Sequence, residues 1–407
     1  MHDSSRTRTT RFGRRAAALG VGAACAVSLT VSVPAQAHST PSITTVISGL
    51  NAPRGVIFDG RGAMYVAESG QAGTGPAGLT HSGKVSKYRW GATKPSWTTS
   101  FESLFVTEDP TQPPDVLGPE GLSSLGRSCV DNGARGGCPV SLITSESHDG
   151  VAAATKGAVQ TTQAGHLFTL DRATGTARDR ADVGDQMYKW TGDRKSLFPS
   201  DFPDSNPYAV LVTRTLGRHD RHSSDGRDSG RVRTFVADAG ANTISEVMPN
   251  GKLRVISYIP NETVQPLRDA TPTCIAQGSD GMLYVGTLHL VANFTKPGQS
   301  DVWRVNPNAN YPTKPKLWAR GLTTVTSCTF DRRGNFWATE MFAPAGAGLP
   351  GDVVRIRHND PDHQTRYGAG TLTLPGGIVQ GPDGAMYVTV NSANPAPGSG
   401  AVMRLRT

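Results

Sequence analysis

A short unit that recurs along the chain constrains its fold more than any other feature. The unit is an apolar strand-like run, a turn built on Asp, and a second run of alternating polarity. Asp-Gly tolerates the backbone angles of a tight hairpin, and alternation is typical of a half-buried strand. Clear copies have their turns at Asp59, Asp280, Asp331 and Asp383, and weaker copies lie at 141–145 and 234–238.

The spacing of these units predicts a β-propeller. The last three clear copies lie about 50 residues apart, a period typical of propeller blades. A third strand-like segment follows most copies, and some have a fourth. One four-stranded sheet cannot bury both of its faces alone, so such sheets pack radially around a channel. We expect an all-β fold, a six-bladed β-propeller with four-stranded antiparallel blades, over residues 38–407.

The two ends of this domain predict how the ring closes. The last unit stops after its third strand, at Thr407, and lacks a fourth. Residues 43–47, which read Ile-Thr-Thr-Val-Ile, precede the first unit and have strand character. We expect this N-terminal strand to complete the last blade, because an open ring would leave a bare edge. The alternative is a frayed N-terminal strand.

Residues 1–37 have the pattern of an export signal peptide. A basic start leads into the charge-free stretch 16–33 and then into Ala35-Gln36-Ala37, a small-x-small cleavage site. We expect cleavage after Ala37 and secretion to the exterior of the cell, the alternative being a retained membrane anchor. Arg14-Arg15 leaves the twin-arginine and the general export routes both open. No second run is apolar and long enough to span a membrane, so we expect no lasting membrane insertion.

The charge of the chain excludes one class of partner. The formal net charge is +8, but residues 1–37 hold five Arg and one Asp, so the remainder carries only +4. Spread over a large surface, this charge is too weak to indicate nucleic-acid binding. Much of the basic character lies in 214–233, where charges of both signs are mixed. This segment is typical of a solvated loop.

The cysteines predict two disulfides. Four remain after the leader, Cys129, Cys138, Cys274 and Cys328, and an even number is typical of an exported disulfide-bonded chain. None forms a C-x-x-C pair with the spacing of a zinc site. We expect Cys129 to pair with Cys138 within a Gly-rich insertion. Cys274 and Cys328 fall on innermost strands of adjacent blades and either form a bridge or remain two buried thiols.

Three motifs resemble a known family. Ser205-Asn206-Pro207-Tyr208 and Asp238-Ala239-Gly240-Ala241-Asn242 resemble the third blade of ScyD/ScyE-like propellers, and Leu50-Asn51-Ala52-Pro53-Arg54-Gly55 resembles the start of their first. The Asp-Gly-x-Leu-Tyr-Val unit is also similar to propellers of the NHL and gluconolactonase type. The resemblance covers essentially the whole mature chain and implies the six-bladed fold. It implies no catalytic residue.

The candidate binding site is the mouth of the channel, on the loops that lead into the innermost strands. These loops carry Arg54, Glu120, Asn206, Thr273, Ser327 and Gly376. In gluconolactonase-like relatives a Glu, an Asn and an Asp at such positions hold a divalent ion, and such an oxygen-rich set suits calcium. Glu120 and Asn206 match two of these ligands, and no Asp stands at the equivalent place in the fourth and fifth units. The alternative is that both side chains cap turns.

Other chemistry-bearing residues are scattered. Four aromatic side chains recur at one position of the unit and are interpreted as blade-packing residues, namely Tyr65, Tyr284, Trp337 and Tyr387. His148-Asp149 follows a strand-like segment and is a candidate proton-transfer pair.

Two classes of function remain, and the missing third ligand favours the first. In the first, the protein is a secreted, monomeric, non-catalytic binding scaffold for a small molecule, a glycan or a protein. In the second, it is a metal-dependent lactonase-like hydrolase or a lyase with its site at the central channel.

Overall fold

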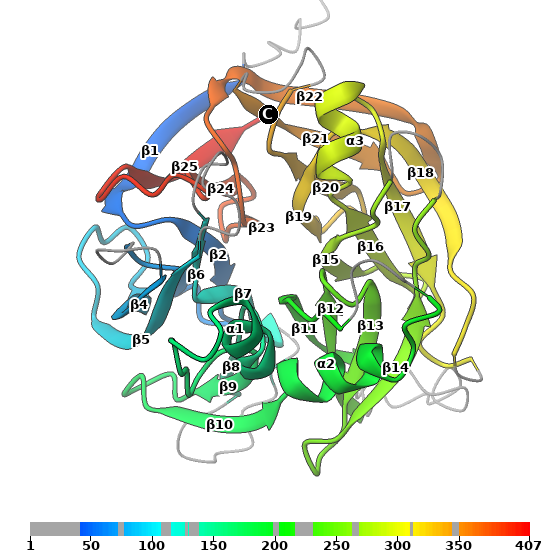
Figure 1. Cartoon of the computed structure of the whole chain (residues 1–407). Helices are drawn as coiled ribbons and strands as arrows, with labels where there is room; N and C mark the ends of the chain where they lie inside the picture. Colours follow the sequence, from blue (N-terminus) through cyan, green and yellow to red (C-terminus); the bar gives the residue numbers. More distant parts are fainter. Residues whose placement is uncertain are drawn as a thin grey trace, which may run out of the picture. The chain divides into compact units, whose positions relative to one another are not determined.

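The folded part of the chain is built almost entirely from β-strands. The computed structural model describes residues 41–71, 77–106, 115–126, 129, 138–197, 203–215, 231–262, 268–309, 312–343 and 350–407. These residues belong to one unit, 40–407, and form six small antiparallel sheets arranged as the blades of a β-propeller (Figure 1). The six-bladed all-β prediction is confirmed. The proposed leader and its cleavage site lie outside the described residues.

The first three blades follow one another along the chain, innermost strand first. Blade 1 contains β2 (Pro53–Phe58), β3 (Met64–Glu68), β4 (Ala77–Tyr88), β5 (Trp97–Val106) and β6 (Asp115–Leu117). Blade 2 contains β7 (Pro119–Ser123), β8 (Val140–Thr144), β9 (His166–Leu170) and β10 (Ala177–Asp182). Blade 3 contains β11 (Pro207–Thr215), β12 (Arg231–Asp238), β13 (Thr243–Val247) and β14 (Leu253–Tyr258).

The last three blades complete the ring. Blade 4 contains β15 (Pro272–Gln277), β16 (Leu283–Thr287), β17 (Ser300–Val305) and β18 (Lys316–Leu322). Blade 5 contains β19 (Val325–Phe330), β20 (Phe336–Glu340), β21 (Gly351–Arg357) and β22 (Asp360–Leu372). Blade 6 contains β23 (Ile378–Gln380), β24 (Met386–Val390), β25 (Gly400–Arg406) and β1 (Ser42–Leu50).

The ends of the chain meet in blade 6, as expected. β1 pairs antiparallel with β25, with Ser42 opposite Arg406 and Leu50 opposite Gly400. The outermost strand of the last blade therefore comes from the segment that precedes the first blade along the chain. This pairing closes the ring without a bare edge, and Figure 1 shows β1 beside β25.

Blade 1 departs from the expected four strands. The short strand β6 pairs with β5, so this sheet has five strands. Residues 115–117 therefore belong to the first blade and not to the second. Blade 2 begins only at Pro119.

The aspartate of the repeated turn has a second role beyond the turn. Asp59 Oδ1 accepts the N–H groups of Arg61 and Ala63, both at 2.9 Å, while its Oδ2 accepts the Tyr65 hydroxyl at 3.1 Å. The same aspartate–aromatic hydrogen bond joins Asp280 to Tyr284, Asp331 to Trp337 and Asp383 to Tyr387. All four aromatic side chains are buried, which confirms their interpretation as packing residues.

The hydrophobic core is divided among the seams of the ring. Each of the six seams between neighbouring blades holds its own cluster of buried side chains. In the seam between blades 4 and 5 the Cys274–Cys328 disulfide, with Cα atoms 5.5 Å apart, joins the innermost strands β15 and β19. Of the two alternatives for these cysteines, a bridge or two buried thiols, the structure has the bridge. The second disulfide joins Cys129 to Cys138, as expected.

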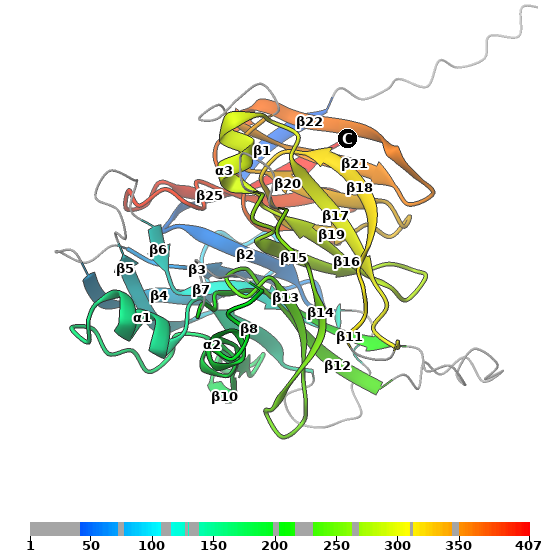
Figure 2. The same ribbon diagram turned by 45° about the vertical axis from the view of Figure 1, so that its right-hand side comes forward.

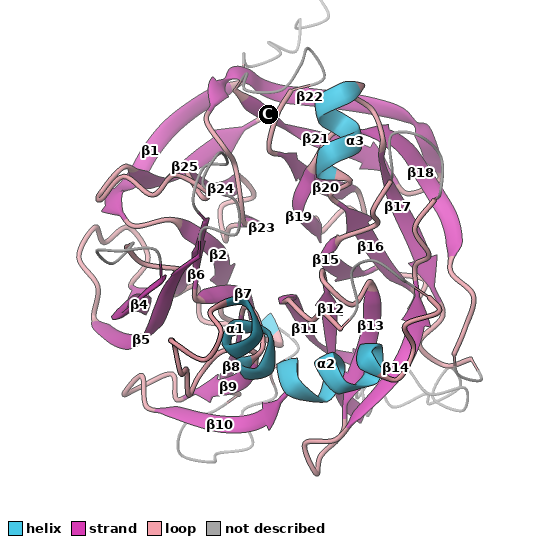
Figure 3. Cartoon of the chain, in the orientation of Figure 1, coloured by secondary structure: helices cyan, strands magenta, loops and turns pink. Residues whose placement is uncertain are grey.

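Three short helices lie on one side of the ring. α1 (His148–Ala154) follows β8, α2 (Gly184–Gly192) follows β10, and α3 (Leu290–Thr295) follows β16. Because the strands are antiparallel, these connections all fall on the side where the innermost strands begin (Figure 3). No helix among the described residues is long and apolar enough to cross a membrane.

Candidate functional site

The channel mouth is formed where the six innermost strands begin. In five of the blades the pairing between the first two strands shifts register at this point, which marks a β-bulge. A bulge re-aims the side chain of its extra residue. The bulge positions are occupied by Arg54, Glu120, Tyr208, Thr273 and Thr326, and we call these five residues the mouth ring.

The mouth ring contains three of the six residues expected from the sequence. Arg54, Glu120 and Thr273 are members and line the channel. Ser327 also lines it, one residue beyond the bulge of its strand. The remaining two, Asn206 and Gly376, are not among the lining residues, and the third blade contributes Tyr208 instead.

Asn206 connects two blades behind the mouth. Its Oδ1 accepts the N–H of Glu146 at 3.3 Å, and its own N–H donates to Asp238 Oδ1 at 2.9 Å. The sequence analysis named Asn206 and missed Tyr208, which lies two residues further along the same motif and lines the channel. A proline begins the innermost strand and precedes the bulge residue in blades 1–4, namely Pro53, Pro119, Pro207 and Pro272. Alignment of the four blades on this proline would have identified Tyr208.

The charged part of the mouth ring is a buried ion pair. Arg54 Nε lies 3.8 Å from Glu120 Oε1, and the two side chains are 5% and 2% exposed. Arg54 Nη1 donates to the Tyr208 hydroxyl at 3.4 Å, and the Ser69 hydroxyl donates to Glu120 Oε1 at 3.4 Å. The carboxylate therefore has a guanidinium and a hydroxyl as its neighbours, and its charge is balanced within the protein.

The threonines of the mouth ring hold neighbouring blades together. The Thr273 hydroxyl donates to the carbonyl of Val325 in the next blade. The Thr326 hydroxyl does the same to Pro375, at 2.7 Å. Buried hydroxyls need such partners. These two side chains therefore stabilise the contacts between neighbouring blades.

Glu120 and Asn206 do not form a site for a divalent ion. A calcium site gathers six to eight oxygen ligands at 2.3–2.6 Å. Here Arg54 lies beside the Glu120 carboxylate, and Asn206 Oδ1 is occupied by the Glu146 amide. We therefore derive no chemistry through a metal at the channel mouth.

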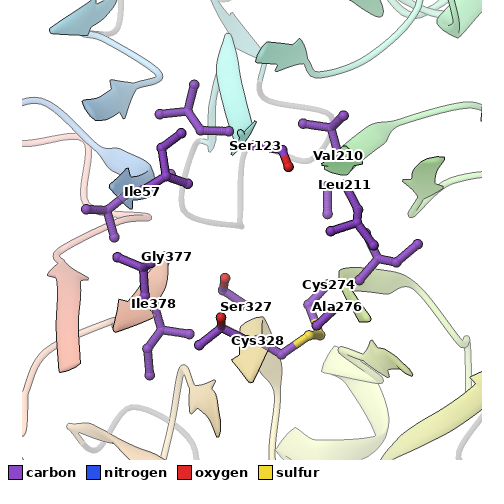
Figure 4. Close-up of a pocket in the computed structure, with 18 of the residues that line it drawn as sticks. Ile57, Ser123, Val210, Leu211, Cys274, Ala276, Ser327, Cys328, Gly377 and Ile378 are labelled. Carbon is purple, nitrogen blue, oxygen red and sulfur yellow. A yellow bond between two sulfur atoms is a disulfide. The ribbon is translucent and has the colours of Figure 1, made fainter. Parts of the chain in front are cut away.

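Below the mouth the channel has a mixed lining of apolar and polar groups. Its cavity of about 280 Å³ is lined by all six innermost strands. Figure 4 shows Ile57, Val210, Leu211 and Ile378 around the opening, with the Cys274–Cys328 disulfide in its wall. Ser123 and Ser327 add hydroxyls. Each innermost strand is the last in its sheet, so its backbone edge also faces the channel.

The ionisable groups of the channel are few. Among the described residues that line it, only Arg54, Glu120 and Tyr208 carry a titratable side chain, since both cysteines are oxidised. General acid–base hydrolysis needs a group free to exchange a proton with the substrate. The only carboxylate here is in a buried ion pair. The geometry suits binding better than proton transfer.

The family-like motif around Asp238 stabilises a loop behind the mouth. Asp238 is buried, and its carboxylate accepts hydrogen bonds from the Ser205 hydroxyl and from the N–H groups of Asn206 and Ala241. Burial raises the pKa of Asp238, and these hydrogen bonds oppose that rise. Asn242, with φ of 53°, continues the loop in the left-handed conformation that Asn tolerates.

A second polar group of residues lies on the mouth side of blade 2. The sequence suggested that His148 and Asp149 form a pair. In the structure both ring nitrogens of His148 have other partners. Its Nδ1 lies 2.8 Å from the Thr161 hydroxyl and its Nε2 lies 2.9 Å from Nε2 of His166. Sequence reasoning missed His166 because 18 residues separate it from His148.

Comparison with known proteins adds no function. No protein-family model and no curated protein matches the sequence. An aldose sugar dehydrogenase from Streptomyces coelicolor, solved with bound PQQ, is 10% identical, with 90% of this chain and 98% of that chain covered and a TM-score of 0.47.

Two further solved structures are similarly distant. Virginiamycin B lyase from Staphylococcus aureus is 12% identical over 90% of this chain and 100% of that chain, with a TM-score of 0.43. The PQQ domain of pyranose dehydrogenase from Coprinopsis cinerea is 12% identical over 91% and 96%, with a TM-score of 0.47. At such values no activity is transferred to this chain.

Proposed function

We propose that the protein is an exported, monomeric, non-catalytic scaffold that binds a small amphipathic molecule in its central channel. The observation that carries this proposal is the composition of the channel. Its lining combines apolar side chains with hydroxyls, the amide of Gln277 and the Arg54–Glu120 pair, whose opposite charges lie side by side. Small-molecule sites are mostly apolar, with a few polar groups that set orientation.

The backbone of the channel supports the same proposal. The inner edge of each innermost strand carries N–H and C=O groups that no further strand covers. A ligand with a few hydrogen-bonding atoms on an apolar body matches such edges. The two disulfides support an extracellular location. The Ser205–Tyr208 and Asp238–Asn242 motifs support a place among the ScyD/ScyE-like propellers.

A fluorescent probe tests binding in the channel. Anilinonaphthalene sulfonate has an apolar body and a small polar group, and its emission rises in an apolar site. We expect saturable binding to the folded protein. Ser327→Leu places a larger side chain in the channel and should weaken binding about tenfold or more, which is about 1.4 kcal/mol.

Ser100→Leu is the matched control, because Ser100 is exposed on the outer strand β5. It makes the same chemical change away from the channel and should leave binding unchanged. Equal loss in both variants, or no loss in either, would refute the channel as the binding site.

The hydrolase alternative is tested separately. Addition of glucono-delta-lactone with added calcium should release no acid faster than the protein-free buffer does. Enzyme-dependent acid release that disappears in Glu120→Gln would replace the scaffold proposal by lactone hydrolysis.

A further inference from the structure

Three potential metal ligands converge on the mouth side of blade 2, outside the channel. His148 is the first residue of α1, His166 the first of β9 and Asp182 the last of β10. One ligand atom from each side chain lies within 4.8 Å of the other two. The two imidazoles present Nε2 to Nε2 at 2.9 Å. We call these three residues the histidine cluster.

A β-bulge builds the carboxylate side of the histidine cluster. In the β9–β10 pairing Asp182 lies opposite His166 and Asp179 lies opposite Phe168, while Arg180 is the extra residue between them. Residues three apart on a regular strand point to opposite faces. The bulge therefore brings Asp179 and Asp182 to the same face as His166. Bulges of this kind re-aim side chains next to functional sites.

Each member of the cluster is held by a further hydrogen bond. His166 Nδ1 lies 2.8 Å from Asp179 Oδ2, and His148 Nδ1 lies 2.8 Å from the Thr161 hydroxyl. Asp182 Oδ1 accepts the N–H of Asp185 at 2.9 Å. Metal-binding histidines typically donate their second ring N–H to a carboxylate or another acceptor, which fixes the orientation of the ring. The cluster has this outer arrangement for all three groups.

The hydrogen bonds also determine which nitrogen atoms carry lone pairs. An ionised carboxylate only accepts, so His166 keeps its proton on Nδ1 and exposes a lone pair at Nε2. The Thr161 hydroxyl can donate or accept. When it donates, His148 carries its proton on Nε2 and bonds to His166. When it accepts, that proton moves to Nδ1, and two lone pairs face each other with Asp182 beside them.

We infer that the histidine cluster binds a divalent transition metal ion of the zinc class through His148 Nε2, His166 Nε2 and the Asp182 carboxylate. The ion replaces the proton between the imidazoles, which moves to His148 Nδ1, where Thr161 accepts it. In tetrahedral zinc coordination two nitrogen ligands lie about 3.3 Å apart, from Zn–N distances of 2.0–2.1 Å. A separation of the rings by a few tenths of an ångström is sufficient.

The ligand types set the selectivity of this site. Imidazole suits zinc, copper and nickel, whereas calcium and magnesium prefer oxygen ligands alone. Three protein ligands leave the fourth tetrahedral position for water or an outside ligand, as in catalytic rather than structural zinc sites. The inference does not depend on the channel, because no member of the cluster lines it.

Calorimetric titration of the purified chain with Zn²⁺, without a polyhistidine tag, tests the inference. We expect one equivalent of bound Zn²⁺ and no binding of Ca²⁺. His166→Ala should remove this binding. Asp179→Asn leaves all three ligands in place but removes the charge that orients His166, and it should weaken zinc binding about 10–100-fold. Co²⁺ should give visible absorption bands of tetrahedral coordination in the wild type and not in His166→Ala.

His363→Ala is the matched control. His363 also contacts an aspartate, Asp360, at 2.7 Å, but it is exposed and no second histidine contacts it among the described residues. This variant should bind zinc like the wild type. If His166→Ala does not fold, Asp182→Asn, which is isosteric, takes its place. Equal zinc affinity in the wild type and in these cluster variants, or absence of stoichiometric binding, would overturn the inference.

Discussion

Blades 1, 4, 5 and 6 differ from blades 2 and 3 in how their first hairpin is built. In the first group an aspartate closes the turn and accepts a hydrogen bond from a buried aromatic side chain. In blades 2 and 3 this turn is replaced by the longer connections 124–139 and 216–230. We call the first group the regular blades and the second the modified blades.

On the opposite side of the ring, the modified blades carry two of the three described helices, whereas α3 follows the second strand of regular blade 4. α1 follows the second strand of blade 2, and α2 links blade 2 to blade 3. Both lie beside the histidine cluster, and α1 contacts α2 (Figure 2). The regular turn supplies hydrogen bonds that stabilise a blade. The proposed metal site, by contrast, lies in modified blade 2, which lacks this turn.

The largest expected effect concerns the disulfide between regular blades. Cys274 and Cys328 are separated by 54 residues, and closing such a loop removes much entropy from the unfolded chain. Replacing both by Ala should lower the free energy of unfolding by about 4 kcal/mol. The matched pair is Cys129→Ala with Cys138→Ala in modified blade 2. With a separation of 9 residues, the expected loss is about 3 kcal/mol. Urea unfolding of both double variants measures the difference, and a larger loss for the shorter loop would contradict it.

A smaller effect is expected from the aspartate of a regular turn. Asp280 accepts hydrogen bonds from Tyr284 at 3.0 Å and from Arg304 at 2.7 Å. Asp280→Asn should lower stability by about 1–3 kcal/mol, because it weakens a charge-assisted bond and leaves partners incompletely satisfied. The control is Asp171→Asn in blade 2, a turn aspartate bonded to Ala173 and Thr174 without an aromatic partner. Asp171→Asn should lower the stability less than Asp280→Asn does. An equal or larger loss of stability in a thermal melt would contradict the proposed difference between the two groups of blades.

The same variant has a defined pH dependence. Burial alone would raise the pKa of Asp280, but hydrogen bonds from Met282, Arg304 and Tyr284 hold the pKa below its usual value. Because the folded pKa is depressed, the stabilisation is complete above the unfolded value, about 3.9, and is lost as the pH falls through the folded value. The stability difference between wild type and Asp280→Asn should therefore be largest near neutral pH and shrink below pH 4. A difference that grows on acidification would contradict this assignment.

The smallest expected effect concerns the histidine cluster without metal. His148→Ala removes two polar contacts on a partly exposed helix start. In the presence of a chelator it should change the free energy of unfolding by about 1 kcal/mol or less. With Zn²⁺ added, only the wild type should gain stability, since the ion binds the folded state alone. A large destabilisation under chelator would identify the cluster as a structural element.

The sequence by itself determined the architecture. Asp-Gly turns between apolar strands recur with a period near that of a propeller blade. The strands and the turn of each unit can be predicted from the residues of that unit alone. Local patterns of this kind predict blade number, ring closure by residues 43–47 and the packing role of Tyr65 and its equivalents. The repeat also places Cys274 and Cys328 on adjacent innermost strands, but the sequence left open whether they form a bridge, and the structure shows that they do.

Only the tertiary structure decided which side chains meet. Tyr208 replaces Asn206 at the mouth because a bulge, which depends on strand pairing, selects the residue that faces the channel. His148 and His166 come from different elements, and Asp182 joins them because one extra residue in β10 changes the face of the strand. Sequence periodicity encodes regular strands, whereas a bulge breaks the period of two on which such a prediction rests.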